Sequence, residues 1–164
     1  MKKLIFVAGA PGSGKSTACG LLKKRLQGHL IEFSDLREWH LDREWKNESE
    51  KEEKMAFENL VFILRNYIKN GYENVIITDL KDSKVQELQK HFKPEEYIIV
   101  SLIVGDDEEI KRRLVERNSG YKNTEAAMEW NRNLILRSPF PNEFKIDNSG
   151  SNPGRAVEAI IKLL

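Results

Sequence analysis

A glycine-rich segment near the start of the chain has the residue types and spacing that bind phosphate. It reads Gly9-Ala10-Pro11-Gly12-Ser13-Gly14-Lys15-Ser16, and Thr17 follows. Glycines adopt backbone conformations that a Cβ hinders and let the main chain approach phosphate oxygens closely. Two glycines ahead of a lysine and a hydroxyl form the P-loop pattern. We therefore expect the nine residues from Gly9 to Thr17 to bind the phosphates of a nucleotide.

Two side chains of this segment have specific expected roles. Lys15 supplies a positive charge to the β- and γ-phosphates, which makes it a candidate catalytic residue as well as a binding residue. The hydroxyl of Ser16 is the expected ligand of Mg²⁺, which bridges the same two phosphates. ATP and Mg²⁺ are therefore the predicted cofactors.

Such a loop must lie between a buried strand and a helix, and the sequence provides both. An apolar run over residues 4–8 precedes the loop, and a helix is expected from Lys15. Further strand-like runs at 30–33, 75–78, 97–104 and 144–146 alternate with helical segments. This βαβ pattern predicts an α/β fold, the three-layer sandwich of P-loop NTPases, with about five parallel strands and helices on both faces.

The middle of the chain contains a long amphipathic segment. Residues 54–70 place six apolar side chains on one helical stripe, and Gly71 is positioned to end the helix. The charge-dense residues 47–54 before it are either a solvated connection that starts the helix or part of a moving substrate flap.

Composition limits the classes of partner. The 164 residues suit one domain over 1–164, and 27 basic against 26 acidic residues give a net charge of +1. A long nucleic acid is not favoured by this balance, although it is not excluded, and no membrane association is expected. The first apolar run is far shorter than a membrane span, so we expect a cytoplasmic protein, as monomer or homodimer. Cys19 is expected to be a buried, inert thiol, and the three histidines lack zinc-ligand spacing.

Two aspartates follow predicted strands, at the sheet edge where ligands of open parallel sheets bind. Asp35 comes after the second strand and Asp79 after the third. We assign Asp35 to the phosphate acceptor as the base that accepts the hydroxyl proton, and Asp79 to the metal side. Asp35 is alternatively a helix N-cap, and Asp79 a turn residue.

Arginines concentrate in the last third of the chain. Arg113 and Arg117 have i, i+4 spacing, and Arg132 lies on the next helical segment. Because guanidinium groups suit the spread charge of a migrating phosphoryl group, residues of about 112–137 are expected to form a short helical lid. Arg113 would contact the nucleotide, and Arg117 and Arg132 are candidate catalytic residues. The alternative is ordinary surface ion pairing, since Glu109 precedes Arg113 by four residues.

With these motifs in order, the chain resembles the small P-loop kinases: nucleoside-monophosphate, shikimate and gluconate kinases and the kinase domain of polynucleotide kinase. The resemblance implies that Asp35 and Arg37 bind the acceptor, and that residues 148–154, including Asn148, lie beside adenine. Asp79 is a further candidate for substrate binding besides its metal role. Residues 152–153 are equally explained as the start of the last helix. The run from Asp79 to Asp82 lacks the arginine of adenylate kinases and the glycine pair of shikimate kinases.

The sequence thus predicts an ATP-dependent kinase that phosphorylates a hydroxyl of a small metabolite. Two other hypotheses stay open. One is a nucleotide-dependent switch or NTPase without a phosphate acceptor, and the other is a 5′-hydroxyl kinase acting on a nucleoside or polynucleotide.

Overall fold

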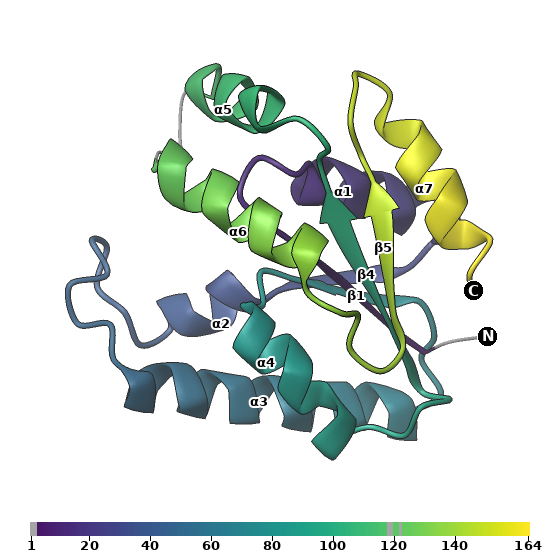
Figure 1. Ribbon diagram of the computed structural model, residues 1–164. Coiled ribbons are helices and arrows are strands. Elements are labelled where there is room, and N and C mark those ends of the chain that lie inside the picture. Colours follow the sequence, from purple (N-terminus) through teal and green to yellow (C-terminus); the bar gives the residue numbers. More distant parts are fainter. Residues whose placement is uncertain (1–2, 118–119, 122) are drawn as a thin grey trace.

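A five-stranded parallel sheet in the order β2-β3-β1-β4-β5 organises the protein. The computed structural model describes residues 3–117, 120–121 and 123–164 (Figure 1). Its elements are β1 (Leu4–Gly9), α1 (Lys15–Leu26), β2 (His29–Glu32), α2 (Phe33–Glu38), α3 (Glu50–Lys69), β3 (Val75–Thr78), α4 (Asp82–Glu87), the 3₁₀ turn η1 (Leu88–Lys90), β4 (Tyr97–Ile103), α5 (Asp107–Val115), α6 (Thr124–Leu136), β5 (Glu143–Asp147) and α7 (Pro153–Ile161).

Alternate side chains of the strands enter two separate cores. In β1, Leu4 and Phe6 pack toward α3 and α4, whereas Ile5 and Val7 pack toward α1 and α7. All four are at most 1% exposed, because the central strand is covered on both faces. Figure 1 shows α3 and α4 on one side of the sheet and α1 and α7 on the other. The predicted three-layer α/β sandwich is confirmed.

The element boundaries differ from the sequence prediction at two places beside the site. Phe33 was expected to end the second strand, but it begins α2, where its ring meets Phe57 of α3 edge to face. The long helix begins at Glu50, four residues earlier than expected, because the Ser49 side chain accepts a hydrogen bond from the Glu52 amide. The charge-dense segment 47–54 therefore contains a helix start.

The two helices of the predicted lid pack against each other: α5 lies beyond the carboxyl end of β4, and α6 runs back across the sheet beside β4 and β1 (Figure 1). Ile110 and Leu114 of α5 meet Ala127 of α6 over the buried Val104. The buried Asn131 side chain fixes α6 to the end of β4, since it accepts from the Val104 amide at 3.1 Å and donates to the Val104 carbonyl at 2.7 Å. Residues 118, 119 and 122 of the predicted lid lie outside the described residues.

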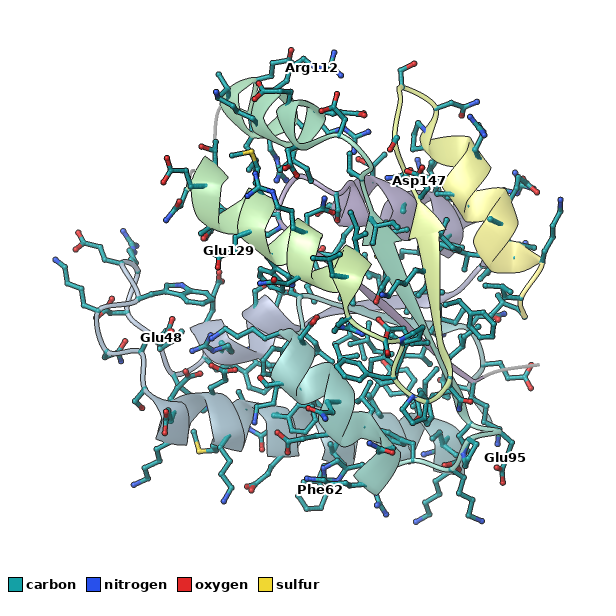
Figure 2. The ribbon with its side chains drawn as sticks, in the orientation of Figure 1. Glu48, Phe62, Glu95, Arg112, Glu129 and Asp147 are labelled. Carbon is teal, nitrogen blue, oxygen red and sulfur yellow. The ribbon has the colours of Figure 1, made fainter. Side chains whose placement is uncertain are left out.

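A few large apolar side chains remain on the surface. Trp39 at the end of α2 is 67% exposed and Phe62 on the outer side of α3 is 74% exposed (Figure 2). Among the helices that the structure describes, none has the length and apolar character needed to cross a membrane. Cys19 is buried on α1, and this burial raises the pKa of its thiol to about 12.

Candidate nucleotide and acceptor site

The loop between β1 and α1 has a conformation that requires glycine. Gly9, Gly12 and Gly14 have φ angles of 142°, 83° and 91°. A Cβ on Gly14 would lie 2.4 Å from Asn148 Nδ2, and a Cβ on Gly9 would lie 2.6 Å from the Leu102 carbonyl oxygen. Gly14 is also the N-cap of α1, so no capping side chain occupies the amides of the first turn. These amides form the kind of surface that binds anions.

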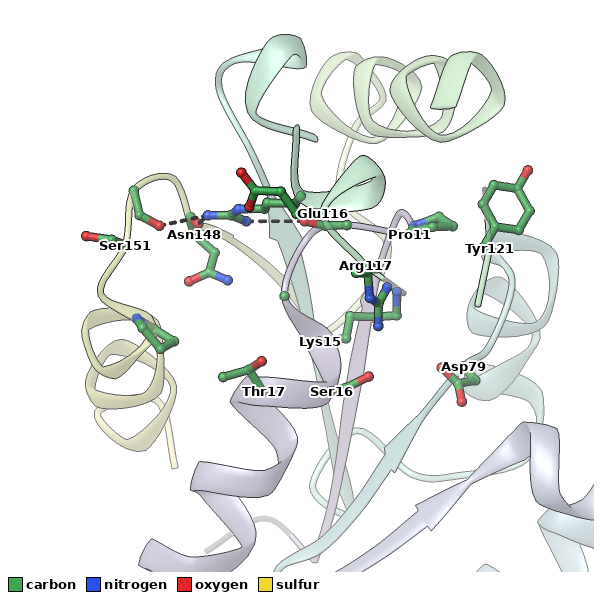
Figure 3. Close-up of a pocket in the computed structure, with 15 residues that line it drawn as sticks. Pro11, Lys15, Ser16, Thr17, Asp79, Glu116, Arg117, Tyr121, Asn148 and Ser151 are labelled. Carbon is green, nitrogen blue, oxygen red and sulfur yellow. Dashed lines mark hydrogen bonds between the residues drawn. The ribbon is translucent and has the colours of Figure 1, made fainter. Parts of the chain in front are cut away.

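A cavity of about 560 Å³ opens over this loop. Its lining comes from the loop, the end of β3, the end of α5 and the segment before α7: Pro11, Gly12, Gly14, Lys15, Ser16, Thr17, Asp79, Arg113, Glu116, Arg117, Tyr121, Asn148, Gly150, Ser151 and Pro153. Figure 3 shows Asn148 and Ser151 on one side of the Lys15 side chain and Asp79 on the other. The cavity therefore has two ends, and the loop lies between them.

Arg113 and Asn148 hold the loop between β1 and α1 through hydrogen bonds to its carbonyl oxygens. Asn148 is 6% exposed and donates to the Ser13 carbonyl at 2.8 Å. Arg113 donates to the carbonyl of Gly12 at 3.2 Å and to the carbonyls of Asn148 and Gly150 at 2.9 and 2.8 Å. Its guanidinium also pairs with Glu109, the alternative that the spacing indicated. Arg113 thus fastens α5 to the loop while its side chain lines the cavity.

Lys15 lies half-buried at the centre of the site. Its ammonium donates to the carbonyls of Gly9 at 2.8 Å and Ala10 at 3.1 Å. Burial lowers the pKa of Lys15 to about 8; the neighbouring Asp79 opposes this decrease and Arg117 adds to it. Figure 3 shows Arg117 close to Lys15, and among the described residues no carboxylate forms an ion pair with either cation. Lys15 and Arg117 therefore place two positive charges at one end of the cavity, and neither forms an ion pair with a described carboxylate.

Carboxylates gather at the neighbouring strand ends. Asp79 follows β3, is exposed, and has a φ of 70°, and its carboxylate accepts a hydrogen bond from the Ser34 hydroxyl at 3.0 Å. Glu32 ends β2 in register with Thr78 of β3. Burial raises the pKa of the Glu32 carboxyl, and the charges of Asp79 and Asp35 raise it further. Three carboxylates thus lie near one another beside the cavity.

The structure corrects the alternative assignment of Asp35 as a helix cap. The N-cap of α2 is Glu32, and Asp35 lies inside the first turn of the helix with its side chain exposed. Asp35 does not line the cavity, but it lies close enough to Glu32 to affect the pKa of that carboxyl. For Asp79, the positive φ fits the turn assignment, and its place in the cavity wall fits a ligand role as well.

Two arginines that were expected at the site are engaged elsewhere. The Arg37 guanidinium is 6% exposed and donates to the Glu52 carboxylate at 2.6 Å, while its flat face lies 5.0 Å from the centre of the Trp45 ring. Arg132 pairs with Asp107 at 2.5 Å on the outside of α5 and α6. Neither side chain lines the cavity, because its carboxylate partner holds it away.

The structure also brings in residues that sequence reasoning did not assign. Glu116 and Tyr121 line the cavity, Ser34 donates a hydrogen bond to Asp79, and Glu32 lies near enough to Asp79 for their charges to interact. Glu32 and Ser34 could have been predicted, because polar residues at a strand end lie at the ligand-binding edge. No local pattern indicated that Tyr121 lines the cavity, whereas Ser151 lies there within the segment 148–154 that the resemblance assigned to adenine. The last helix begins as expected, with Asn152 as N-cap and Pro153 in the first turn.

A metal ion at this place would need ligands that are not protein carboxylates alone. Among the described residues, no three histidine, cysteine, aspartate or glutamate side chains form a group that could hold a metal. Ser16 and Asp79 line the same end of the cavity (Figure 3) and offer one hydroxyl and one carboxylate. This small donor set suits Mg²⁺, which keeps several waters and binds phosphate oxygens.

Comparison with known proteins identifies relatives of this chain. The family described as an AAA domain matches residues 5–132. A sugar kinase from Janibacter sp. HTCC2649 has a similar structure with a TM-score of 0.73 and 15% identity, over 99% of this chain and 94% of that one. A gluconokinase from Sinorhizobium meliloti 1021 has a TM-score of 0.66 and 17% identity, over 95% and 87% of the two chains.

A shikimate kinase from Acinetobacter baumannii in complex with shikimate has a TM-score of 0.62 and 17% identity, over 99% of this chain and 93% of that one. No curated protein matches the chain in sequence. The likeness to these structures lies in the fold, and the family match covers most of the chain. The protein therefore belongs to the AAA-domain family and has the fold of the small P-loop kinases.

Proposed function

We propose that this protein is a kinase that transfers the γ-phosphoryl group of ATP to a hydroxyl of a small metabolite. The observation that carries the proposal is the position of Lys15 and Arg117. Both cations face one end of the cavity with no carboxylate paired to them among the described residues, and Asp79 stands beside them. Unpaired cations next to a carboxylate cluster suit phosphoryl transfer, in which negative charge develops near a hydroxyl that loses its proton.

The proposed roles follow the two ends of the cavity. The loop amides from Gly12 to Thr17 bind the phosphates, and the end formed by Asn148, Ser151 and Pro153 takes the nucleoside. Lys15 leaves the carbonyls of Gly9 and Ala10 to bind phosphate oxygens. Ser16 and Asp79 would hold Mg²⁺, which would supply positive charge next to the phosphates.

Transfer to the acceptor uses the carboxylates beyond Asp79. The acceptor hydroxyl approaches from the α2 side, where Asp35 accepts its proton as the oxygen forms a bond to phosphorus and the bond to ADP breaks. Arg117 stabilises the charge on the migrating group. The segment 112–137 acts as the lid, with Arg113 of α5 and Arg117, two residues after the end of α5, in the cavity wall. The fold likeness to a sugar kinase, a gluconokinase and a shikimate kinase supports a small hydroxyl acceptor.

The proposal is tested by measuring ADP release from Mg-ATP with a panel of sugars, polyols, hydroxy acids, nucleosides and oligonucleotides. We expect at least one small acceptor to raise the rate severalfold, and Lys15→Ala to abolish this rise. Lys23→Ala, an exposed lysine later on α1, is the matched control and should behave as wild type. ADP release that no acceptor changes would instead indicate a nucleotide-dependent switch or NTPase, and stimulation by oligonucleotides alone would indicate a 5′-hydroxyl kinase.

A further inference from the structure

The cation expected to bind an anionic acceptor is neutralised within the protein. Arg37 follows β2 in the position that the resemblance gives to an acceptor-binding arginine. Its guanidinium donates through Nε and Nη2 to Glu52 at 3.1 and 2.6 Å, with Glu48 at 3.6 Å and Glu53 at 3.9 Å. Three carboxylates therefore surround one cation, and Glu48 lies in the connection between α2 and α3 (Figure 2).

The next cation along this sheet edge is also paired. Lys81 follows Asp79 by two residues, and its ammonium contacts Glu53 at 2.8 Å. The side chain of Glu53 is only 14% exposed, so α3 holds both cations with largely covered carboxylates. A bound anion would have to displace these partners, which costs more than binding an exposed lysine.

Apart from Lys15 and Arg117 in the cavity wall, the unpaired charges at the ends of β2 and β3 are negative. Glu32, Asp35 and Asp79 lie at the ends of β2 and β3, and Ser34 donates to Asp79 between them. With Asp79 on the metal side, Glu32 and the exposed Asp35 remain as two further carboxylates beside the proposed acceptor position. Two carboxylates near a carboxylate or phosphate of a substrate repel it, because like charges in a partly buried site interact strongly.

An aromatic surface lies on the same side of α2 as Asp35. Trp39 follows Asp35 by four residues and has helical backbone angles, φ −63° and ψ −22°, so the two side chains share a helix face. Trp39 is 67% exposed, which is high for the largest apolar side chain. The flat indole offers a surface for a ring, with the carboxylate of Asp35 one helical turn away.

Building on the proposed function, we infer that the acceptor is an uncharged hydroxyl compound with a ring, of the sugar or nucleoside class, that stacks on Trp39 while Asp35 receives its proton. Arg37 has no part in binding it. Acceptors that carry a carboxylate or a phosphate, such as shikimate, gluconate or a nucleoside monophosphate, are disfavoured by Glu32 and Asp35.

The first test compares matched acceptors that differ in charge: glucose with gluconate, and adenosine and guanosine with their 5′-monophosphates. Binding is measured by tryptophan fluorescence and calorimetry in the presence of Mg²⁺ and a non-hydrolysable ATP analogue, and turnover by ADP release from ATP. We expect a neutral member to bind at least tenfold more tightly than its charged partner. Tighter binding of a charged member, or no binding of any neutral member, would overturn the inference. Neutral binding without turnover would overturn the kinase proposal alone.

The second test changes the charge of the acceptor edge. Glu32→Gln should reduce the discrimination between neutral and charged members severalfold, with little change in the affinity for the neutral member. Glu73→Gln is the matched control: it removes the same charge from an exposed glutamate that precedes β3 at the opposite edge of the sheet. Trp39→Ala should weaken binding of the neutral acceptor and leave nucleotide binding unchanged. Equal effects of Glu32→Gln and Glu73→Gln, or wild-type acceptor affinity in Trp39→Ala, would contradict the inference.

Discussion

The two ends of the site are built in different ways. At the nucleotide end, one continuous segment from Gly9 to Thr17 provides the backbone, and Arg113 and Asn148 fasten it through carbonyl oxygens. At the acceptor end, residues from β2, α2 and β3 come together, and α3 removes the charge of Arg37 and Lys81 through Glu52 and Glu53. The nucleotide end thus depends on backbone geometry, whereas the acceptor end depends on which charges are paired.

We propose that this difference lets one fold serve different acceptors. Glycines and free amides suit phosphate binding whatever the acceptor. The proposed acceptor end would change its specificity when one side chain gains or loses a partner, because an arginine bound to a buried glutamate no longer offers its charge to a ligand. The following predictions test that contrast.

The largest expected effect concerns the two aspartates of the acceptor end. Asp35→Asn should lower acceptor-dependent transfer by roughly a hundredfold to ten-thousandfold and leave ATP affinity nearly intact, because an amide cannot accept the proton. Asp79→Asn should also weaken the dependence on Mg²⁺. Single-turnover transfer in both variants checks this assignment. Wild-type transfer in Asp35→Asn with no transfer in Asp79→Asn would mean that the two roles are reversed.

Replacing Arg37 should lower the stability of the fold and leave acceptor binding unchanged. Arg37→Met leaves the buried Glu52 carboxylate without its partner, so we expect a loss of about 3 kcal/mol in the free energy of unfolding. Arg132→Met is the control, because its pair with Asp107 is largely exposed and should cost less than about 1 kcal/mol. Urea unfolding measures both. A stable Arg37→Met variant with a raised acceptor KM would show that Arg37 binds substrate.

Variants of the lid arginines distinguish stabilisation of the transition-state charge from binding of the ground-state nucleotide. Arg117→Ala should lower kcat by about a hundredfold and ATP affinity much less, because its contribution grows as charge develops. Arg132→Ala should have a smaller effect, since Arg132 is paired with Asp107 and does not line the cavity. Arg112→Ala, exposed on the outside of α5 (Figure 2), is the control. Parallel losses of kcat and affinity in Arg117→Ala would assign it to ground-state binding.

The pH dependence of ATP binding should follow the protonation of the Lys15 side chain. Its pKa is about 8 in the free protein against an ordinary 10.5, and phosphate binds the protonated form. Affinity should therefore be flat below pH 8 and fall by about tenfold per unit above it, with proton uptake on binding. Lys15→Arg should abolish this dependence, because arginine stays charged. Calorimetry in buffers of different ionisation enthalpy measures the uptake, and a flat profile to pH 9.5 would contradict it.

The same shift has a consequence for folding. Because the folded pKa of Lys15 lies below the unfolded value, its burial destabilises the fold most below pH 8, and this cost is lost as pH rises toward 10.5.

Local patterns in the sequence predicted the scaffold and the nucleotide end. Three patterns each span only a short stretch of sequence: the glycine spacing, the five apolar runs and the amphipathic stripe. Each of them reflects structure that is determined by residues close together in the chain. The sequence pattern did not indicate that Glu52 pairs with Arg37, because the partners lie on different helices. It also placed Phe33 in a strand, since only the contact with Phe57 favours the helix.

The most direct test of the account follows the label of γ-³²P-ATP in the presence of a neutral acceptor that binds the protein. Thin-layer chromatography separates labelled acceptor from inorganic phosphate. We expect the label to appear in the acceptor at a rate that depends on Asp35 and Lys15. Label that appears only in inorganic phosphate, at a rate unaffected by the acceptor, would contradict it.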